Sequence, residues 1–259
     1  MPFPEVERVV YRTNPLVRVA FQAKFPKFLA IETEQPAEFQ KVIMGNYPIY
    51  DQQNVLQVIL GSGHDGSQQP AEIQGRMHVF RSSDKIWTLM LGGDQVFLAT
   101  SVYTHWGEFK DRLRAILSAF FQFYHPALFT RIGLRYQNLI RPEELGLDGH
   151  RWKDLLQPYI AGELASGLED PEIVARQTVT TIKFGDGDAL LLRHGLVTHK
   201  DSKKPAYLID GDFYNDEQRE ADFDGILEIT ERLHENSERV FRWSIAEAVH
   251  AAMGPGSAR

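Results

Sequence analysis

The chain has 259 residues, a formal net charge of −7 from 35 acidic and 28 basic side chains, and a hydrophobic fraction of 43%. That hydrophobic fraction is typical of a globular protein with a buried core. The acidic balance argues against general nucleic-acid binding. Because the sequence contains no cysteine, disulfide frameworks, thiolate nucleophiles and cysteine-ligated metal sites are excluded.

The beginning of the chain, MPFPEVERVVYRTNP, lacks the basic start and apolar run of a signal peptide. No stretch of the sequence approaches the ~18 uninterrupted apolar residues that a membrane-spanning helix needs. We therefore expect a cytoplasmic protein that has no membrane contact.

The first half of the chain predicts a strand, a helix, a meander of strands and a long helix. Alternating apolar residues indicate a strand over 16–25, and a proline suits the first turn of a helix over 36–44. Turn residues separate the next predicted strands, which are 54–61, 76–83, 86–93 and 95–103. Apolar residues three and four apart then predict an amphipathic helix over 105–125, with Thr104 as its N-cap.

The second half repeats this order. RIGLRYQNLI (131–140) alternates as a strand, and a helix over about 152–164 follows, bent or interrupted at Pro158. The next predicted strands are 176–184, 189–198 and 205–214, the first two joined by a Gly-Asp-Gly-Asp hairpin turn. A long helix over about 222–252 precedes a loose tail, 254–259.

This order predicts an α+β fold in which residues 1–126 and 127–253 are pseudo-repeats of one compact unit. Each half has the β-α-β(3-4)-α order of a helix-grip arrangement, similar to the TATA-binding-protein fold. Because the connections between the halves are short, we expect one curved antiparallel sheet with both long helices on a single face.

Several stretches carry a family resemblance, namely YRTNPLVRVAFQAKFP (11–26), RIGLRYQN (131–138), YLIDGDFY (207–214) and LHENSERVFRWSIAEAVHAAM (233–253). Together they resemble a sporadically distributed family of uncharacterised bacterial proteins of about this length, which has no established function. Gly211 departs from the family pattern, which has an apolar residue between the two aspartates. The resemblance implies no catalytic residue and no cofactor, and the sporadic distribution implies a link to mobile or defence systems.

Two arginines, Arg131 and Arg135, flank a glycine on the polar face of the 131–140 strand. On the 205–214 strand, Asp210 and Asp212 also share one face, where their like charges need neutralising partners. If these two strands are neighbours, the four side chains can form a ladder of ion pairs.

The alternative is that the arginines bind an anion or an acidic partner. In that case Tyr136 or Tyr214 would complete a site for a phosphate, a carboxylate or a planar ligand.

Three further features of the sequence give weaker indications of function. GSGHDG (61–66) matches the glycine pattern of a dinucleotide-binding loop, but no helical pattern follows it, so we interpret it as a hairpin loop. His194 and His199 lie near Asp210 and Asp212 in the predicted sheet, which makes His194 with the two aspartates a weak candidate metal site. His234 is interpreted as a hydrogen-bonded core histidine.

Three functions remain open. The first is a non-enzymatic module that binds a small anionic ligand or a protein, because no catalytic constellation is recognisable. The second is an enzyme acting on a phosphorylated or carboxylated substrate, with the arginines as an anion clamp and the aspartates as acid, base or metal ligand. The third is self-association into a homodimer through exposed strand edges.

Overall fold

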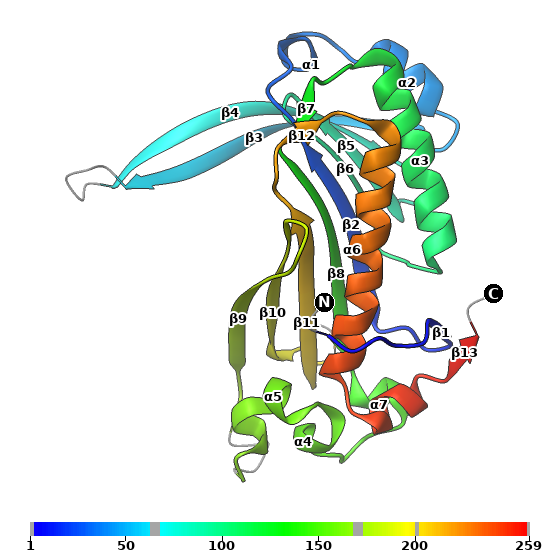
Figure 1. Ribbon diagram of the computed structural model, residues 1–259, viewed down its shortest axis with the longest axis vertical. Helices are drawn as coiled ribbons and strands as arrows, with labels where there is room; N and C mark the ends of the chain where they lie inside the picture. Colours follow the sequence, from blue (N-terminus) through cyan, green and yellow to red (C-terminus); the bar gives the residue numbers. More distant parts are fainter. Residues whose placement is uncertain (1–2, 63–67, 168–172, 200–201, 258–259) are drawn as a thin grey trace.

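A nine-stranded antiparallel sheet organises the computed structural model, which describes residues 3–62, 68–167, 173–199 and 202–257 (Figure 1). From edge to edge the strands are β3 (Ile49–Ser62), β4 (Gln68–Arg81), β5 (Trp87–Gly92), β6 (Gln95–Thr100), β2 (Leu16–Lys24), β8 (Arg131–Ile140), β11 (Pro205–Asn215), β10 (Asp188–Thr198) and β9 (Arg176–Lys183). Strands from the first half of the chain lie on one side, strands from the second half lie on the other, and β2 pairs with β8 between them. The predicted α+β class and continuous antiparallel sheet are confirmed.

Two long helices, α3 (Trp106–Phe123) and α6 (Phe223–Ser244), cover the same face of this sheet (Figure 1). The register places Trp87 and Tyr136 in one cross-strand row, so their side chains point to the same face. Trp87 packs against Phe109 of α3 and Tyr136 against His234 of α6, with ring centroids 5.6 and 5.9 Å apart. We call this the helix side of the sheet, and we call the opposite side the open face.

Shorter elements connect and close the sheet. They are α1 (Leu29–Thr33), α2 (Ala37–Ile43), η1 (Pro142–Leu145), α4 (Trp152–Leu155), α5 (Pro158–Ala161), η2 (Gly162–Ala165) and α7 (Glu247–Ala252). Two small strand pairs are β7 (Leu128–Phe129) with β12 (Arg219–Glu220), and β1 (Val9–Tyr11) with β13 (Pro255–Ser257). The loose tail expected at 254–259 is therefore wrong for residues 255–257, which tie the C-terminal segment to the N-terminal one. Among the described residues, no helix is long and apolar enough to cross a membrane.

The helix expected over 222–252 is interrupted. It ends at Ser244 and resumes as α7 at Glu247, because residues 155–157 form hydrogen bonds with the backbone between the two helices. Ala246 N–H donates to the carbonyl of Leu155 at 2.9 Å, and Gln157 N–H donates to the carbonyl of Ser244 at 3.1 Å. The helix expected over 152–164 is split as well, since Pro158 begins a new short helix, α5.

The first hairpin of the sheet is longer than its apolar pattern indicates. β3 begins at Ile49 and β4 at Gln68, where the sequence predicts strands from 54 and 76. Both extensions are rich in polar residues and carry little alternation of apolar ones. Of the glycine-rich motif at 61–66, Gly61 and Ser62 end β3, and residues 63–66 lie outside the described residues.

Candidate functional site

The four charged residues singled out by the sequence meet one another on the open face. Arg131 Nη2 donates to both carboxylate oxygens of Asp212, each at 2.9 Å. Arg135 Nε and Nη2 donate to the two oxygens of Asp210 at 2.7 and 2.5 Å. The Asp210 side chain is only 4% exposed, and its hydrogen bonds raise the pKa of Arg135 above the ordinary value. Both arginines of β8 therefore form ion pairs with aspartates of the neighbouring strand, β11.

Gly133 explains how Arg131 reaches its partner. A Cβ atom at Gly133 would collide with the Arg131 guanidinium, which lies directly over the glycine. From there the guanidinium donates to Gln22 Oε1 at 2.9 Å, and its Cζ atom lies 4.9 Å from the centroid of the Tyr214 ring. The glycine between the two arginines therefore provides the space that the ion pair needs.

A shallow depression of about 180 Å³ adjoins these ion pairs on the open face. Arg18 of β2 lies in its wall, exposed, with its guanidinium 5.8 Å from the centroid of the Phe97 ring. No ion pair holds Arg18 within the described part of the chain. The volume of the depression leaves room for only a small ligand.

The weak metal candidate is not assembled. His194 of β10 lies opposite Ile209 on the helix side, whereas Asp210 and Asp212 lie on the open face. His194 Nδ1 instead shares a 2.8 Å hydrogen bond with the hydroxyl of Tyr207, and burial lowers the pKa of His194 to about 4. His199 lies beyond the end of β10 and hydrogen-bonds Ser202. Across the described ranges, no three His, Asp or Glu side chains gather as a metal-binding group.

A much larger cavity, of about 750 Å³, lies on the helix side. It is enclosed by residues 6–11 of the N-terminal segment, the start of α3, one face of α6 and the floor formed by β8. Its aromatic lining consists of Tyr11, Tyr103, Trp106, Tyr136 and Phe241. This combination of an apolar concave surface with a few polar groups is typical of small-molecule sites.

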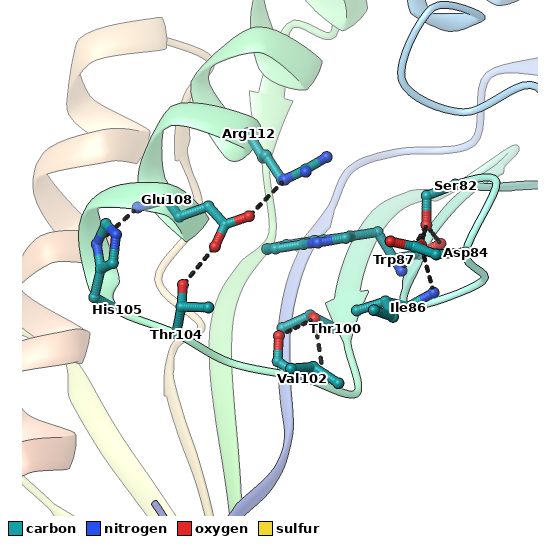
Figure 2. A network of polar contacts seen from close by, with 10 residues as sticks. All are labelled: Ser82, Asp84, Ile86, Trp87, Thr100, Val102, Thr104, His105, Glu108 and Arg112. Atoms are coloured by element: carbon teal, nitrogen blue, oxygen red, sulfur yellow. Dashed lines mark hydrogen bonds and ion pairs between the residues drawn. The ribbon is translucent and has the colours of Figure 1, made fainter. Parts of the chain in front are cut away.

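The start of α3 forms one rim of this cavity, and a polar network fixes it (Figure 2). His105, and not the predicted Thr104, is the N-cap, since its Nδ1 accepts a hydrogen bond from Glu108 N–H at 3.2 Å. The hydroxyl of Thr104 donates to the Glu108 carboxylate, which also accepts from Arg112 Nε at 3.4 Å. Arg112 lies 4.5 Å from the centroid of the Trp87 ring, so the network connects the rim to β5.

A tyrosine and a histidine join at the floor of the cavity. The hydroxyl of Tyr136 and Nδ1 of His234 are 2.8 Å apart, and the Trp106 ring stacks on His234 with centroids 4.1 Å apart. His234 Nε2 is buried and has no hydrogen-bond partner among the described residues, although it lies 3.4 Å from Glu238 Oε1. This contact does not have the geometry of a hydrogen bond, and because His234 is neutral at pH 7 it is not an ion pair either.

The titratable groups at this floor are kept uncharged. Burial lowers the pKa of His234 to about 3 and raises the pKa of Tyr136 well above its ordinary value. Burial also raises the pKa of Tyr103, which packs edge-on against Tyr136 with ring centroids 6.2 Å apart. At neutral pH the floor is therefore polar but carries no charge.

Four of the charged residues around the cavity form ion pairs with each other. Arg8 Nε donates to Glu238 at 3.1 Å, and Lys110 Nζ donates to Glu231 at 2.5 Å. Trp106 Nε1 donates to the same Glu231 carboxylate at 2.9 Å. Despite Arg8, burial raises the pKa of Glu238. These pairs compensate four of the charges at the cavity, whereas Glu7, which also lines it, has no ion pair within the described part of the chain.

The sequence indicated only part of this cavity. Tyr136 was a candidate, but as a companion of Arg131 and Arg135, and it points to the opposite face of β8. His234 was expected to be a core histidine with its hydrogen bonds satisfied. Its Nδ1 is hydrogen-bonded, but its Nε2 has no hydrogen-bond partner among the described residues. The available signal was the spacing of polar residues beside the apolar stripe of α6, where His234 and Glu238 are four residues apart.

Comparison with known proteins adds no assignment. No protein-family model matches the sequence, and no curated protein matches it either. The function has to be argued from the residues of the cavity themselves.

Proposed function

We propose that this protein is a non-enzymatic binding protein that holds a small, largely apolar ligand in the cavity between α3, α6 and the N-terminal segment. The observation that carries the proposal is the volume of about 750 Å³ with its aromatic lining and paired rim charges. Cavities of this size bury most of the surface of a small organic ligand, and a few polar groups orient it.

The chemistry of the floor supports binding over catalysis. A general base or acid works best when its pKa lies near the operating pH. The pKa of His234 is about 3, and the pKa of Tyr136 lies far above neutrality. These groups therefore hold their protons fixed at neutral pH, which suits hydrogen bonding to a ligand.

The open face gives weaker support to an enzyme with an arginine clamp. An anion that bound to Arg131 or Arg135 would have to displace the carboxylates of Asp210 and Asp212, which already accept bidentate hydrogen bonds. The adjoining depression, of about 180 Å³, is also small for a phosphorylated metabolite.

We also propose that the two halves of the chain are a duplicated helix-grip unit, similar to the TATA-binding-protein fold, and that the chain belongs to the sporadic bacterial family it resembles. The strand order supports a duplication, since each half places its first strand at the centre of the sheet and its last strand beside it. In each half the strands are followed by one long helix, α3 or α6. A link to mobile or defence systems rests on the family resemblance alone.

The ligand-binding proposal is tested with N-phenyl-1-naphthylamine, an uncharged probe whose fluorescence rises in apolar surroundings. We expect saturable binding to the wild type with one site. Leu16→Trp, which adds bulk to the cavity wall, should weaken binding at least tenfold. Val42→Trp is the control, because Val42 is 53% exposed on α2 and away from the cavity. Equal binding by wild type and Leu16→Trp would contradict the proposal.

A further inference from the structure

An unpaired amide lies at the floor of the cavity. Asn138 of β8 lines the cavity and is only 6% exposed. Within the described part of the chain, its side-chain amide has no hydrogen-bond partner, and its atoms are not among the fully buried ones, so the amide is accessible from the cavity. Buried polar groups are nearly always paired in native proteins, so an unpaired one that lines a cavity calls for a partner from outside.

The amide offers a specific pattern to that partner. A carboxamide presents a hydrogen-bond acceptor and a donor side by side in one plane. Asn138 lies two residues from Tyr136 on the same face of β8, so the two side chains are neighbours on the floor, where the Tyr136 hydroxyl is already bonded to His234. A ligand that satisfies the amide must therefore supply a complementary donor and acceptor on one edge.

The surroundings limit the rest of the ligand. The rings of Tyr103 and Trp106 border the space above the floor, and aromatic faces favour a flat partner. Four of the rim charges are already compensated, because Arg8 pairs with Glu238 and Lys110 with Glu231. A charged ligand that bound to one of these four residues would have to break its pair, whereas an uncharged ligand leaves both pairs intact.

We propose that the cavity binds an uncharged, planar heterocycle that carries a hydrogen-bond donor and acceptor side by side, as a cyclic amide or a nucleobase does, and that Asn138 pairs with this edge. The inference rests on the proposed function, since it names the ligand class of the same cavity. In this proposal Asn138 hydrogen-bonds the donor and acceptor of the ligand, and the rings of Tyr103 and Trp106 contact the faces of its ring.

The test compares four compounds of similar size by calorimetry. Quinolin-2-one carries the paired edge, N-methylquinolin-2-one lacks the donor, naphthalene lacks both groups, and quinoline-2-carboxylate is charged. We expect the wild type to bind quinolin-2-one at least tenfold more tightly than each of the other three. The basis is that an unpaired buried hydrogen-bonding group lowers affinity by about ten- to a hundredfold.

Asn138→Leu keeps the approximate shape of the side chain and removes the amide. It should weaken quinolin-2-one binding by the same ten- to hundredfold and leave naphthalene binding unchanged. Asn46→Leu, at an exposed turn position outside the cavity, is the matched control and should change neither affinity.

The outcomes separate the two proposals. If naphthalene binds and quinolin-2-one has no advantage, or if Asn138→Leu binds quinolin-2-one as well as the wild type, the assigned ligand class is wrong and the cavity proposal stands. If neither these compounds nor N-phenyl-1-naphthylamine binds, both proposals are wrong.

Discussion

At the scale of single residues, Gly133 shows how the absence of a side chain determines the position of a neighbouring one. The Arg131 guanidinium occupies the space where a Cβ atom of residue 133 would be, and from there it reaches both oxygens of Asp212. Both charged side chains are about one-fifth exposed, at 20% and 22%. The pair is therefore shielded enough to contribute measurably to stability.

A double-mutant cycle tests this contact. In the wild type, Gly133→Ala should displace the guanidinium and weaken the ion pair. In an Arg131→Met background the same change should stabilise the protein, since alanine is favoured over glycine in a strand interior by about 0.5–1 kcal/mol. We expect a coupling free energy of about 1 kcal/mol between the two positions, measured by urea unfolding.

An equal effect of Gly133→Ala in both backgrounds would show that the glycine does not serve the arginine. A suitable control is Gly75→Ala in β4, where an added Cβ atom meets nothing within 4 Å. Its effect should be the same with Arg131 or Met at position 131.

At the scale of elements, local sequence predicts where a helix starts better than where it ends. The α6 helix begins after Asp222, whose Oδ2 accepts a hydrogen bond from Gly225 N–H at 2.6 Å, and this start lies within one residue of the predicted one. Its end at Ser244 depends on hydrogen bonds with Leu155 and Gln157, which are nearly ninety residues away in the chain. An apolar period cannot reveal such partners, because it continues through the break.

The capping bond gives a prediction for α6. Asp222→Ala should lower the free energy of unfolding by about 1 kcal/mol, because Gly225 N–H loses its acceptor. Asp222→Asn should retain most of the stability, since its side-chain oxygen can still accept. Asp224→Ala, in the first turn but without a capping bond, is the control. Chemical unfolding of the three variants measures the differences, and equal losses for Asp222→Ala and Asp224→Ala would contradict the capping role.

The cavity was beyond prediction for a related reason. Its lining comes from the N-terminal segment, the start of α3, β8 and α6, which are distant in sequence. β1 and β13 are three residues each and pair across almost the whole chain, so neither carries a periodic pattern of its own. Adjacent residues of a strand point to opposite faces, and Tyr136 and Arg135 do so, which removes Tyr136 from the arginine site in which it was a candidate. What it could not show is that one of those faces is incompletely filled.

At the scale of the whole molecule, one polar arrangement recurs on the helix side of the sheet. This side buries three neutral histidines, each bonded through Nδ1 to a tyrosine. The pairs are His78 with Tyr50, His194 with Tyr207, and His234 with Tyr136.

The neighbours fix the tautomers of two of these histidines. His78 Nε2 lies 3.0 Å from the Ile31 carbonyl, so it carries the proton and Nδ1 accepts from Tyr50. The Tyr207 hydroxyl donates to the Ile160 carbonyl at 2.8 Å, so His194 Nδ1 is the donor in the other pair.

These buried histidines predict an acid-sensitive fold. Burial is the main cause that lowers the pKa of each, to about 4 for His194 and about 3 for His234. In the unfolded chain a histidine has a pKa of about 6.5. As the pH falls below that value, these histidines bind protons in the unfolded chain but stay neutral in the folded protein. Their contribution to stability is therefore fully present above pH 6.5 and is lost on acidification.

Each of the two histidines should cost about 1.4 kcal/mol in total between pH 7.5 and 5.5, so the pair should remove about 3 kcal/mol over this window. The raised pKa of Glu238, caused mainly by burial, acts in the opposite direction, because the folded protein binds a proton there more readily than the unfolded chain does. Around His234, Arg8 and Lys110 lower its pKa further, whereas Glu231 raises it. Urea unfolding at both pH values, on the wild type and on His194→Gln/His234→Gln, measures the effect. The double variant should lose far less stability on acidification, and an identical loss would show that other groups set the acid limit of the fold.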